Sequence, residues 1–217
     1  MYASIGEMLD LKGFDRMIAI IDYDAGNLKS VEKALEYIGE KPVITRDKNE
    51  ILSAGRVILP GVGAFGDAMG NLRRYDLVDT LRIVADKGTP LLGICMGMQA
   101  LFDRSDETDG VDGLSILSGE IKAIPHDGIH KIPHMGWNSL EFSKESKLFS
   151  GIPEGSYVYF VHSYYLEAAD AGDVAATTEY VCHIDAAVEK DNIFGCQFHP
   201  EKSGDIGLDI LKNFVTI

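Results

Sequence analysis

The chain has 217 residues, of which 46% are hydrophobic and 25% charged, the size and composition of one globular domain with a substantial core. Its formal net charge of −14 argues against nucleic acid or an anionic membrane as the main partner, because both repel an acidic surface. No segment approaches the ~20 apolar residues that cross a bilayer, and residues 1–16 lack the pattern of a signal peptide. Three cysteines without CxxC spacing argue against a disulfide framework, so we expect a reducing cytoplasm.

The first half of the chain alternates apolar runs with helical patterns. MIAIID at 17–22 predicts a buried strand, and a helix follows that has Val31, Ala34, Leu35 and Ile38 on one face and Gly39 as its stop. The next predicted elements are strands at PVIT and RVILP, a helix over 67–87 and a strand at PLLGI, residues 90–94. This order predicts parallel strands joined by right-handed crossovers.

After about residue 112 the helices give way to short extended runs. GEIKAI, WNSLEF and YVYFVH predict strands, residues 179–198 predict two strands joined by a turn near Asp191, and residues 205–214 predict a final helix. We therefore expect one α/β domain over 17–217, with a mixed, mostly parallel central sheet flanked by helices. Residues 1–16 would form an N-terminal extension dispensable for stability and activity.

The sharpest local signal is LLGICMGMQALF, in which an apolar strand enters Gly93-Ile94-Cys95-Met96-Gly97 and a helical pattern follows. This pattern is typical of a nucleophile elbow with cysteine as the nucleophile. The sharp turn crowds the positions two before and two after Cys95, which favours glycine at both. A helix N-terminus beneath Cys95 would favour its thiolate. A buried structural cysteine is the alternative.

The second signal is Gln197-Phe198-His199-Pro200-Glu201. Proline disfavours the helical region for the residue before it, so His199 should be extended. Side chains two apart in an extended chain point the same way, so Glu201 could orient the imidazole of His199 toward a nucleophile. A surface turn is the alternative for this short motif alone.

The third signal is the glycine-rich loop Leu59-Pro60-Gly61-Val62-Gly63, which follows a predicted buried strand. Its backbone should lie at the carboxyl edge of the sheet, where N–H groups can approach an oxyanion. The three signals together supply a nucleophile, an oriented base and an oxyanion loop.

At this point the chain resembles the class I, triad-type glutamine amidotransferases, through PGVGAFGD, GICMGMQ and CQFHPEKS. Within that class, IDYDAGNLKSVEKALE, IPHMGWN and YFVHSYY are similar to the glutaminase subunits of imidazole glycerol phosphate synthases. The resemblance begins at Met17. Asp24 stands where the family usually has glycine, which leaves the geometry of that turn open.

The resemblance implies a role for each matching residue. Cys95 would be the nucleophile, His199 the base and Glu201 the orienting carboxylate. The glutamine pocket would be made by Gln99 and by the backbone of Gly61, Gly63, Ser163 and Tyr164, and the oxyanion loop by Gly61, Val62 and Met96. No cofactor is implied. The ammonia would pass to a separate (β/α)₈-barrel cyclase subunit, which acts in histidine biosynthesis.

Other assignments stay open. Met135 and Trp137 are core residues by default, but beside Pro133 and Gly136 they could equally anchor a partner, and we assign them to the cyclase interface. His126, His130 and His134 have the spacing of a helical metal site, yet the prolines and glycine among them disfavour a helix, so no metal is expected. The alternatives are another amidotransferase subunit, such as that of anthranilate synthase, a stand-alone amidohydrolase or a non-catalytic module. IPHMGWN and DYDAGN argue against the first, and the intact triad argues against the last.

Overall fold

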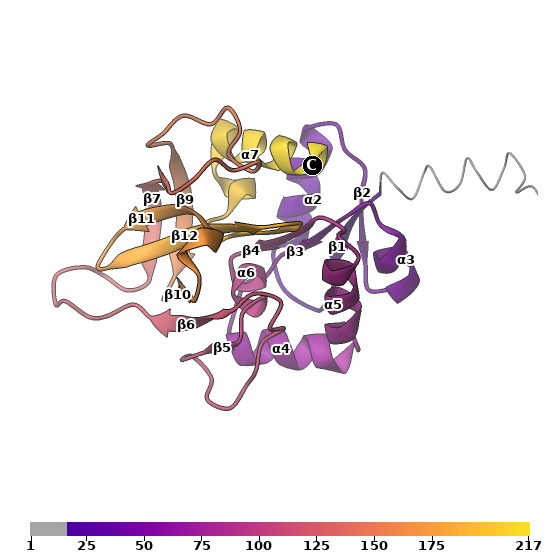
Figure 1. Cartoon of the computed structure of the whole chain (residues 1–217), viewed down its shortest axis with the longest axis horizontal. Coiled ribbons are helices and arrows are strands. Elements are labelled where there is room, and N and C mark those ends of the chain that lie inside the picture. The colour runs from indigo at the N-terminus through magenta and orange to yellow at the C-terminus, as the bar shows by residue number, and fades with distance from the viewer. Residues whose placement is uncertain (1–16) are drawn as a thin grey trace, which may run out of the picture.

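A computed structural model of the chain describes residues 17–217, and in this range an eleven-stranded sheet has helices on both faces of its parallel part (Figure 1). The strands, in order across the sheet, are β2 (Pro42–Thr45), β1 (Ile18–Ile21), β3 (Arg56–Leu59), β4 (Leu91–Ile94), β13 (Ile193–Cys196), β12 (His183–Lys190), β10 (Tyr164–Ala168), β6 (Gly119–Ala123) and β5 (Arg104–Ser105). Two further strands, β11 (Val174–Glu179) and β8 (Glu141–Phe142), continue the sheet from β12. The predicted mixed α/β fold is confirmed.

The strands from β2 to β13 are parallel to one another, and those beyond β13 pair mostly antiparallel. The parallel strands β1, β4 and β13 are buried along their whole length, as continuous apolar runs predict for strands covered on both faces. Alternate side chains divide between the two layers: Ala19 and Ile21 pack on one side of the sheet, Ile18 and Ile20 on the other.

The helices close both faces of the parallel strands. One layer contains α2 (Leu28–Tyr37) and α7 (Gly204–Thr216); the other contains α3 (Lys48–Ser53), α4 (Phe65–Arg74) and α5 (Val78–Asp86) (Figure 1). Each fully buried Leu, Ile or Phe contributes about 1.5–3 kcal/mol to this core. The short α6 (Met96–Ala100) packs in the second layer, directly after β4.

The structure differs from three sequence expectations. The helix predicted over 67–87 is two helices, α4 and α5, because Asp76 adopts a left-handed conformation with φ 55° between them. The extended run WNSLEF is split between β7 (His134–Ser139) and β8, and β7 pairs with β9 (Tyr157–His162) in a separate two-stranded sheet. The helix α3 was not predicted; the Asp47 carboxylate caps it by accepting from the N–H groups of Asn49 and Glu50.

The turn after β1 keeps a left-handed residue where the family usually has glycine. Asp24 has φ 63°, and its carboxylate accepts hydrogen bonds from Arg46 (2.7 Å) and from the hydroxyl of Tyr75. These side-chain contacts offset the steric cost of the left-handed conformation.

Among the helices of residues 17–217, none combines the length and apolar character needed to cross a membrane. The predicted N-terminal extension, residues 1–16, lies outside the described residues, so the domain boundary at Met17 stays a prediction.

Candidate active site

Cys95 lies on a strained turn between β4 and α6. Its backbone has φ 53° and ψ −110°, a conformation that costs a non-glycine residue on the order of 1–3 kcal/mol. A Cβ on Gly93 would lie 2.6 Å from Met98 Cα, and one on Gly97 would lie 1.7 Å from the carbonyl oxygen of Leu59. Both glycines are therefore required by close packing: Gly93 by the turn itself, as expected, and Gly97 by the neighbouring strand β3.

His199 is brought to Cys95 by the pairing of β13 with β4. Ile94 lies opposite Cys196, and the N–H of Cys95 donates to the carbonyl of Cys196 at 2.8 Å. The backbone N–H of His199 donates to the carbonyl of Tyr159 at 2.9 Å, which ties the histidine to β9. Its Nε2 is buried without a hydrogen-bond partner among the described residues, and it lines the same pocket as Cys95.

Glu201 contacts the other ring nitrogen of His199. The distance from Nδ1 to Oε1 is 2.7 Å, and both side chains are fully buried. His199 is extended, as predicted, with φ −103° and ψ 95°. The prediction that Glu201 is also extended is wrong, because Pro200 begins a 3₁₀ helix, η2 (Pro200–Lys202), and the carboxylate reaches the ring from that turn.

The surroundings of His199 favour its charged form. Burial alone would lower the pKa of the imidazole, but the neighbouring Cys95 thiol and the hydrogen bond with Glu201, together with the negative charge that each side chain can carry, raise it to about 9. An imidazolium beside the sulfur is the arrangement that can protonate a leaving group.

Asn27 is a site residue that the sequence analysis did not single out. Its Nδ2 donates to Glu201 Oε1 at 2.5 Å, so that one carboxylate oxygen contacts both Asn27 and His199. Asn27 lies at the N-terminus of α2 with φ 77°. Its position after β1, at the carboxyl edge of the sheet and within the segment IDYDAGN, was the available signal.

Two buried glutamines lie beneath the thiol. Gln197, which was also missed, donates from Nε2 toward Cys95 Sγ at 3.6 Å. Gln99 donates to Gln197 Oε1 at 2.8 Å and to the carbonyl of Tyr164 at 3.0 Å. The Oε1 of Gln99 is buried without a partner among the described residues, so it remains available as an acceptor.

A pocket of about 360 Å³ joins most of the predicted residues. Its walls include Val62, Gly63, Cys95, Met96, Gln99, Glu107, Ser163, Tyr164 and His199. Gly61 lies behind this wall, where a Cβ would be 2.3 Å from the Tyr23 hydroxyl and 3.0 Å from the backbone N of Gly97. The glycine loop thus packs directly on the elbow, as its position after β3 predicts.

Glu107 is the carboxylate of this pocket, and no sequence motif marked it. Its Oε2 accepts from the backbone N–H of Phe65 at 2.7 Å, at the start of α4. This bond fixes a negative charge at the pocket wall, in the same cavity as Cys95 and Gln99.

Met135 and Trp137 lie outside the pocket, on β7. They are 62% and 54% exposed, so the core alternative does not hold for either residue. Tyr157 on β9 is 59% exposed. The rings of Trp137 and Tyr159 pack edge to face, with their centroids 6.1 Å apart. We call Met135, Trp137 and Tyr157 the β7–β9 apolar surface.

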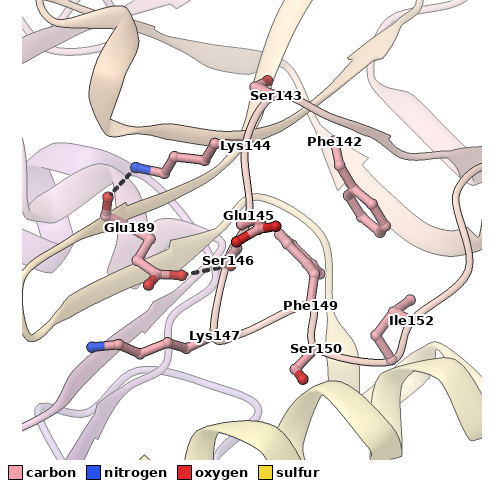
Figure 2. A pocket seen from close by; sticks show the side chains of 10 residues that line it. All are labelled: Phe142, Ser143, Lys144, Glu145, Ser146, Lys147, Phe149, Ser150, Ile152 and Glu189. Carbon is pink, nitrogen blue, oxygen red and sulfur yellow. Dashed lines mark hydrogen bonds between the residues drawn. The ribbon is translucent and has the colours of Figure 1, made fainter.

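Figure 2 shows a second hollow, whose volume of about 760 Å³ is larger than that of the Cys95 pocket. It is lined by Phe142, Ser143, Lys144, Glu145, Ser146, Lys147, Phe149, Ser150, Ile152 and Glu189. Lys144 donates to the carbonyls of Gly172 and Glu189, both at 2.6 Å, and Ser146 donates to the Glu189 carboxylate at 2.5 Å. These polar groups are engaged within the protein, and the hollow is lined by no cysteine or histidine. Within residues 17–217 no cluster of three or more His, Cys, Asp or Glu side chains could hold a metal ion.

Comparison with known protein families gives the same assignment as this geometry. The chain belongs to the class-I glutamine amidotransferase family, whose model matches residues 19–217. Within it, the chain is 54% identical to the imidazole glycerol phosphate synthase subunit HisH of Bacillus cereus (strain G9842), over 91% of this chain and 93% of the relative. It is 53% identical to the HisH subunit of Moorella thermoacetica, over 92% and 94% of the two chains.

Solved structures support the fold. A crystal structure of a glutamine amidotransferase matches with a TM-score of 0.71 at 18% identity, covering 92% of this chain and 99% of the other. A chain of the PurLQS structure from Thermotoga maritima matches with a TM-score of 0.72 at 21% identity, covering 92% and 97%.

Proposed function

We propose that this chain is the glutaminase subunit of an imidazole glycerol phosphate synthase. The observation that carries the proposal is the strained Cys95 elbow beside the buried His199–Glu201 pair, in a chain more than half identical to HisH subunits. The proposed activity is hydrolysis of the glutamine side-chain amide to glutamate and ammonia.

In the proposed reaction Cys95 Sγ attacks the amide carbon of glutamine and forms a C–S bond. The C–N bond breaks as His199 gives its proton to the leaving nitrogen, so ammonia departs and a thioester remains. Water then attacks the thioester, returns a proton to His199 and releases glutamate and the Cys95 thiolate. Glu201 holds the imidazole through Nδ1 and stabilises its positive charge.

Backbone N–H groups are proposed to stabilise the oxyanion of the tetrahedral intermediate. Met96 follows the nucleophile at the N-terminus of α6, and Val62, in the glycine loop, lines the same pocket. The close fit of Gly61 against Tyr23 and Gly97 supports this placement, because it brings the loop backbone to the elbow.

The polar groups of the pocket suit an α-amino acid. The carboxylate of Glu107 would pair with the substrate ammonium, and the free Oε1 of Gln99 would accept a hydrogen bond from the substrate. The backbone of Ser163 and Tyr164 would supply further contacts.

The proposed partner is a (β/α)₈-barrel cyclase subunit that receives the ammonia. The β7–β9 apolar surface supports a docking role, because three large apolar side chains are exposed together on one small sheet. We infer that Met135 and Trp137 contact the cyclase there.

The test is to purify the chain with a cyclase barrel and to measure glutamine-dependent turnover. Formation of imidazole glycerol phosphate from glutamine is the expected result. Full glutamine hydrolysis without any partner would instead indicate a stand-alone amidohydrolase. Turnover only with the synthase partner for anthranilate would indicate the other class of subunit.

A further inference from the structure

Two buried histidines lie outside the triad. His134 begins β7 and His162 ends β9, opposite each other in the two-stranded sheet. They are only 3% and 6% exposed, and the reaction described above uses neither. His162 also lines the pocket that holds Cys95.

The inner end of this histidine pair contacts the pocket backbone. His162 Nδ1 lies 2.9 Å from the carbonyl oxygen of Tyr164. A carbonyl can only accept, so this nitrogen carries the hydrogen and donates it. The same carbonyl accepts from Gln99 Nε2 at 3.0 Å, and the backbone at Tyr164 is therefore fixed from two sides.

The outer end contacts Asn138 on β7. The Asn138 amide nitrogen donates to the carbonyl of Glu179 at 2.8 Å, and its oxygen accepts from the N–H of Ser139 at 2.9 Å. The remaining amide hydrogen faces His134 Nε2 at 3.4 Å, which must therefore accept. His134 then carries its hydrogen on Nδ1.

The two rings meet with one donor and one acceptor. His134 Nδ1 lies 2.9 Å from His162 Nε2, and the assignments at both ends make His134 the donor. Burial lowers the pKa of His134 to about 4 and that of His162 to about 3, so both rings are neutral near pH 7. With both rings in the Nδ1–H tautomer, each of the three hydrogen bonds, Asn138 to His134, His134 to His162 and His162 to Tyr164, has one donor and one acceptor.

We propose that His134 and His162 are positioning residues for glutamine, because their hydrogen-bond chain fixes the Ser163–Tyr164 backbone of the pocket and connects it to β7. This proposal rests on the proposed glutaminase function. The hydrogen-bond chain ends at Asn138 on β7, the strand that carries Met135 and Trp137. It therefore also joins the β7–β9 apolar surface to the glutamine pocket.

A matched pair of variants separates hydrogen bonding from packing. The His134 ring stacks on Phe160 and Tyr180, with centroids 4.8 Å and 4.1 Å away. His134→Phe keeps this stacking and removes both nitrogens, whereas His134→Gln keeps one donor and one acceptor and loses the ring. His126→Phe, at an exposed position, is the control for the substitution itself.

Steady-state kinetics on the complex with the cyclase give the first measurement. We expect His134→Phe to raise KM for glutamine by about 5- to 30-fold with a much smaller change in kcat, because a buried acceptor on His162 loses its donor. His134→Gln should raise KM less. A smaller effect of Phe than of Gln would overturn the proposal, since packing would then be the role of His134.

Histidine ¹⁵N spectra of the free chain give a second measurement that needs no turnover. Both His134 and His162 should show the Nδ1–H tautomer. Asn138→Asp, at a half-buried position, replaces the donor with an acceptor and should place a proton on His134 Nε2. An Nε2–H tautomer for either ring in the unsubstituted protein would overturn the proposal. Absence of glutamine hydrolysis by the unsubstituted complex would instead refute the glutaminase function.

Discussion

Replacing Glu201 with Gln tests how the site keeps a proton on His199. One oxygen of Glu201 contacts both His199 Nδ1 at 2.7 Å and Asn27 Nδ2 at 2.5 Å. Glutamine has the same shape, and its carbonyl oxygen can accept both bonds. The substitution therefore removes the negative charge while it leaves the tautomer of the imidazole in place.

The structure gives the size of the effect. The pKa of His199 lies at about 9 instead of 6.5 in spite of burial, through Cys95 and Glu201. This difference corresponds to roughly 3 kcal/mol in favour of the imidazolium, shared between the two partners. Losing about half or more of it should lower kcat by about 10- to 100-fold. His199→Ala should cost more, on the order of 10²–10⁴, because it removes the proton donor itself.

The direction of the pH dependence follows from the same values. A group with a raised pKa keeps its proton up to that pKa, so the wild-type imidazolium persists until the pH rises through about 9. In Glu201→Gln the pKa of His199 should fall, and kcat should decline at a lower pH. Titration of His199 by NMR and a pH–rate profile measure this, with His126→Gln as the surface control. An unchanged pKa, or a larger loss of kcat than in His199→Ala, would refute the reasoning.

Four further outcomes are expected. Cys95→Ser should abolish glutamine hydrolysis, while the complex still turns over with ammonium salt; glutamate release near the wild-type rate would contradict the assignment. Glu107→Gln should raise KM for glutamine by about 10- to 100-fold through loss of a charged hydrogen bond, and an unchanged KM would exclude ammonium binding there. Gly97→Ala should lower the free energy of unfolding by about 1–3 kcal/mol in denaturant titration, because the added methyl meets the Leu59 carbonyl; wild-type stability would show that the elbow can yield. The kcat for glutamine should be low for the chain alone, and higher with the cyclase and its ligand; equal values would mean that the oxyanion hole is permanently formed.

The sequence predicted those parts of the site that depend on local chain geometry. The elbow at Cys95 needs two glycines within five residues, and the extended backbone of His199 follows from the proline after it. Glu201 was paired with His199 correctly, although a 3₁₀ turn rather than extended chain brings the two together. These contacts lie within a few residues along the chain, where backbone restrictions act.

The missed residues depend on tertiary contacts. Asn27 meets Glu201 from 174 residues away, and Glu107 meets Phe65 from 42 residues away. The tertiary fold brings these side chains together, and the local sequence pattern does not predict which of them meet. The two helices in place of the one predicted over 67–87 have a different cause, a left-handed Asp76 that apolar periodicity does not reveal.

The place of β13 in the sheet has a consequence for the order in which the site is assembled during synthesis. Strands β1 to β4 come from residues 18–94, but the strand that covers the open side of β4 and leads to His199 comes from residues 193–196. A growing polypeptide therefore presents an unpaired edge of β4 next to the thiol until residues 193–196 have been translated. Nascent chains should therefore be unable to hydrolyse glutamine before β13 pairs with β4. This pairing is late and joins segments far apart in the sequence. Until it forms, the exposed edge of β4 favours aggregation.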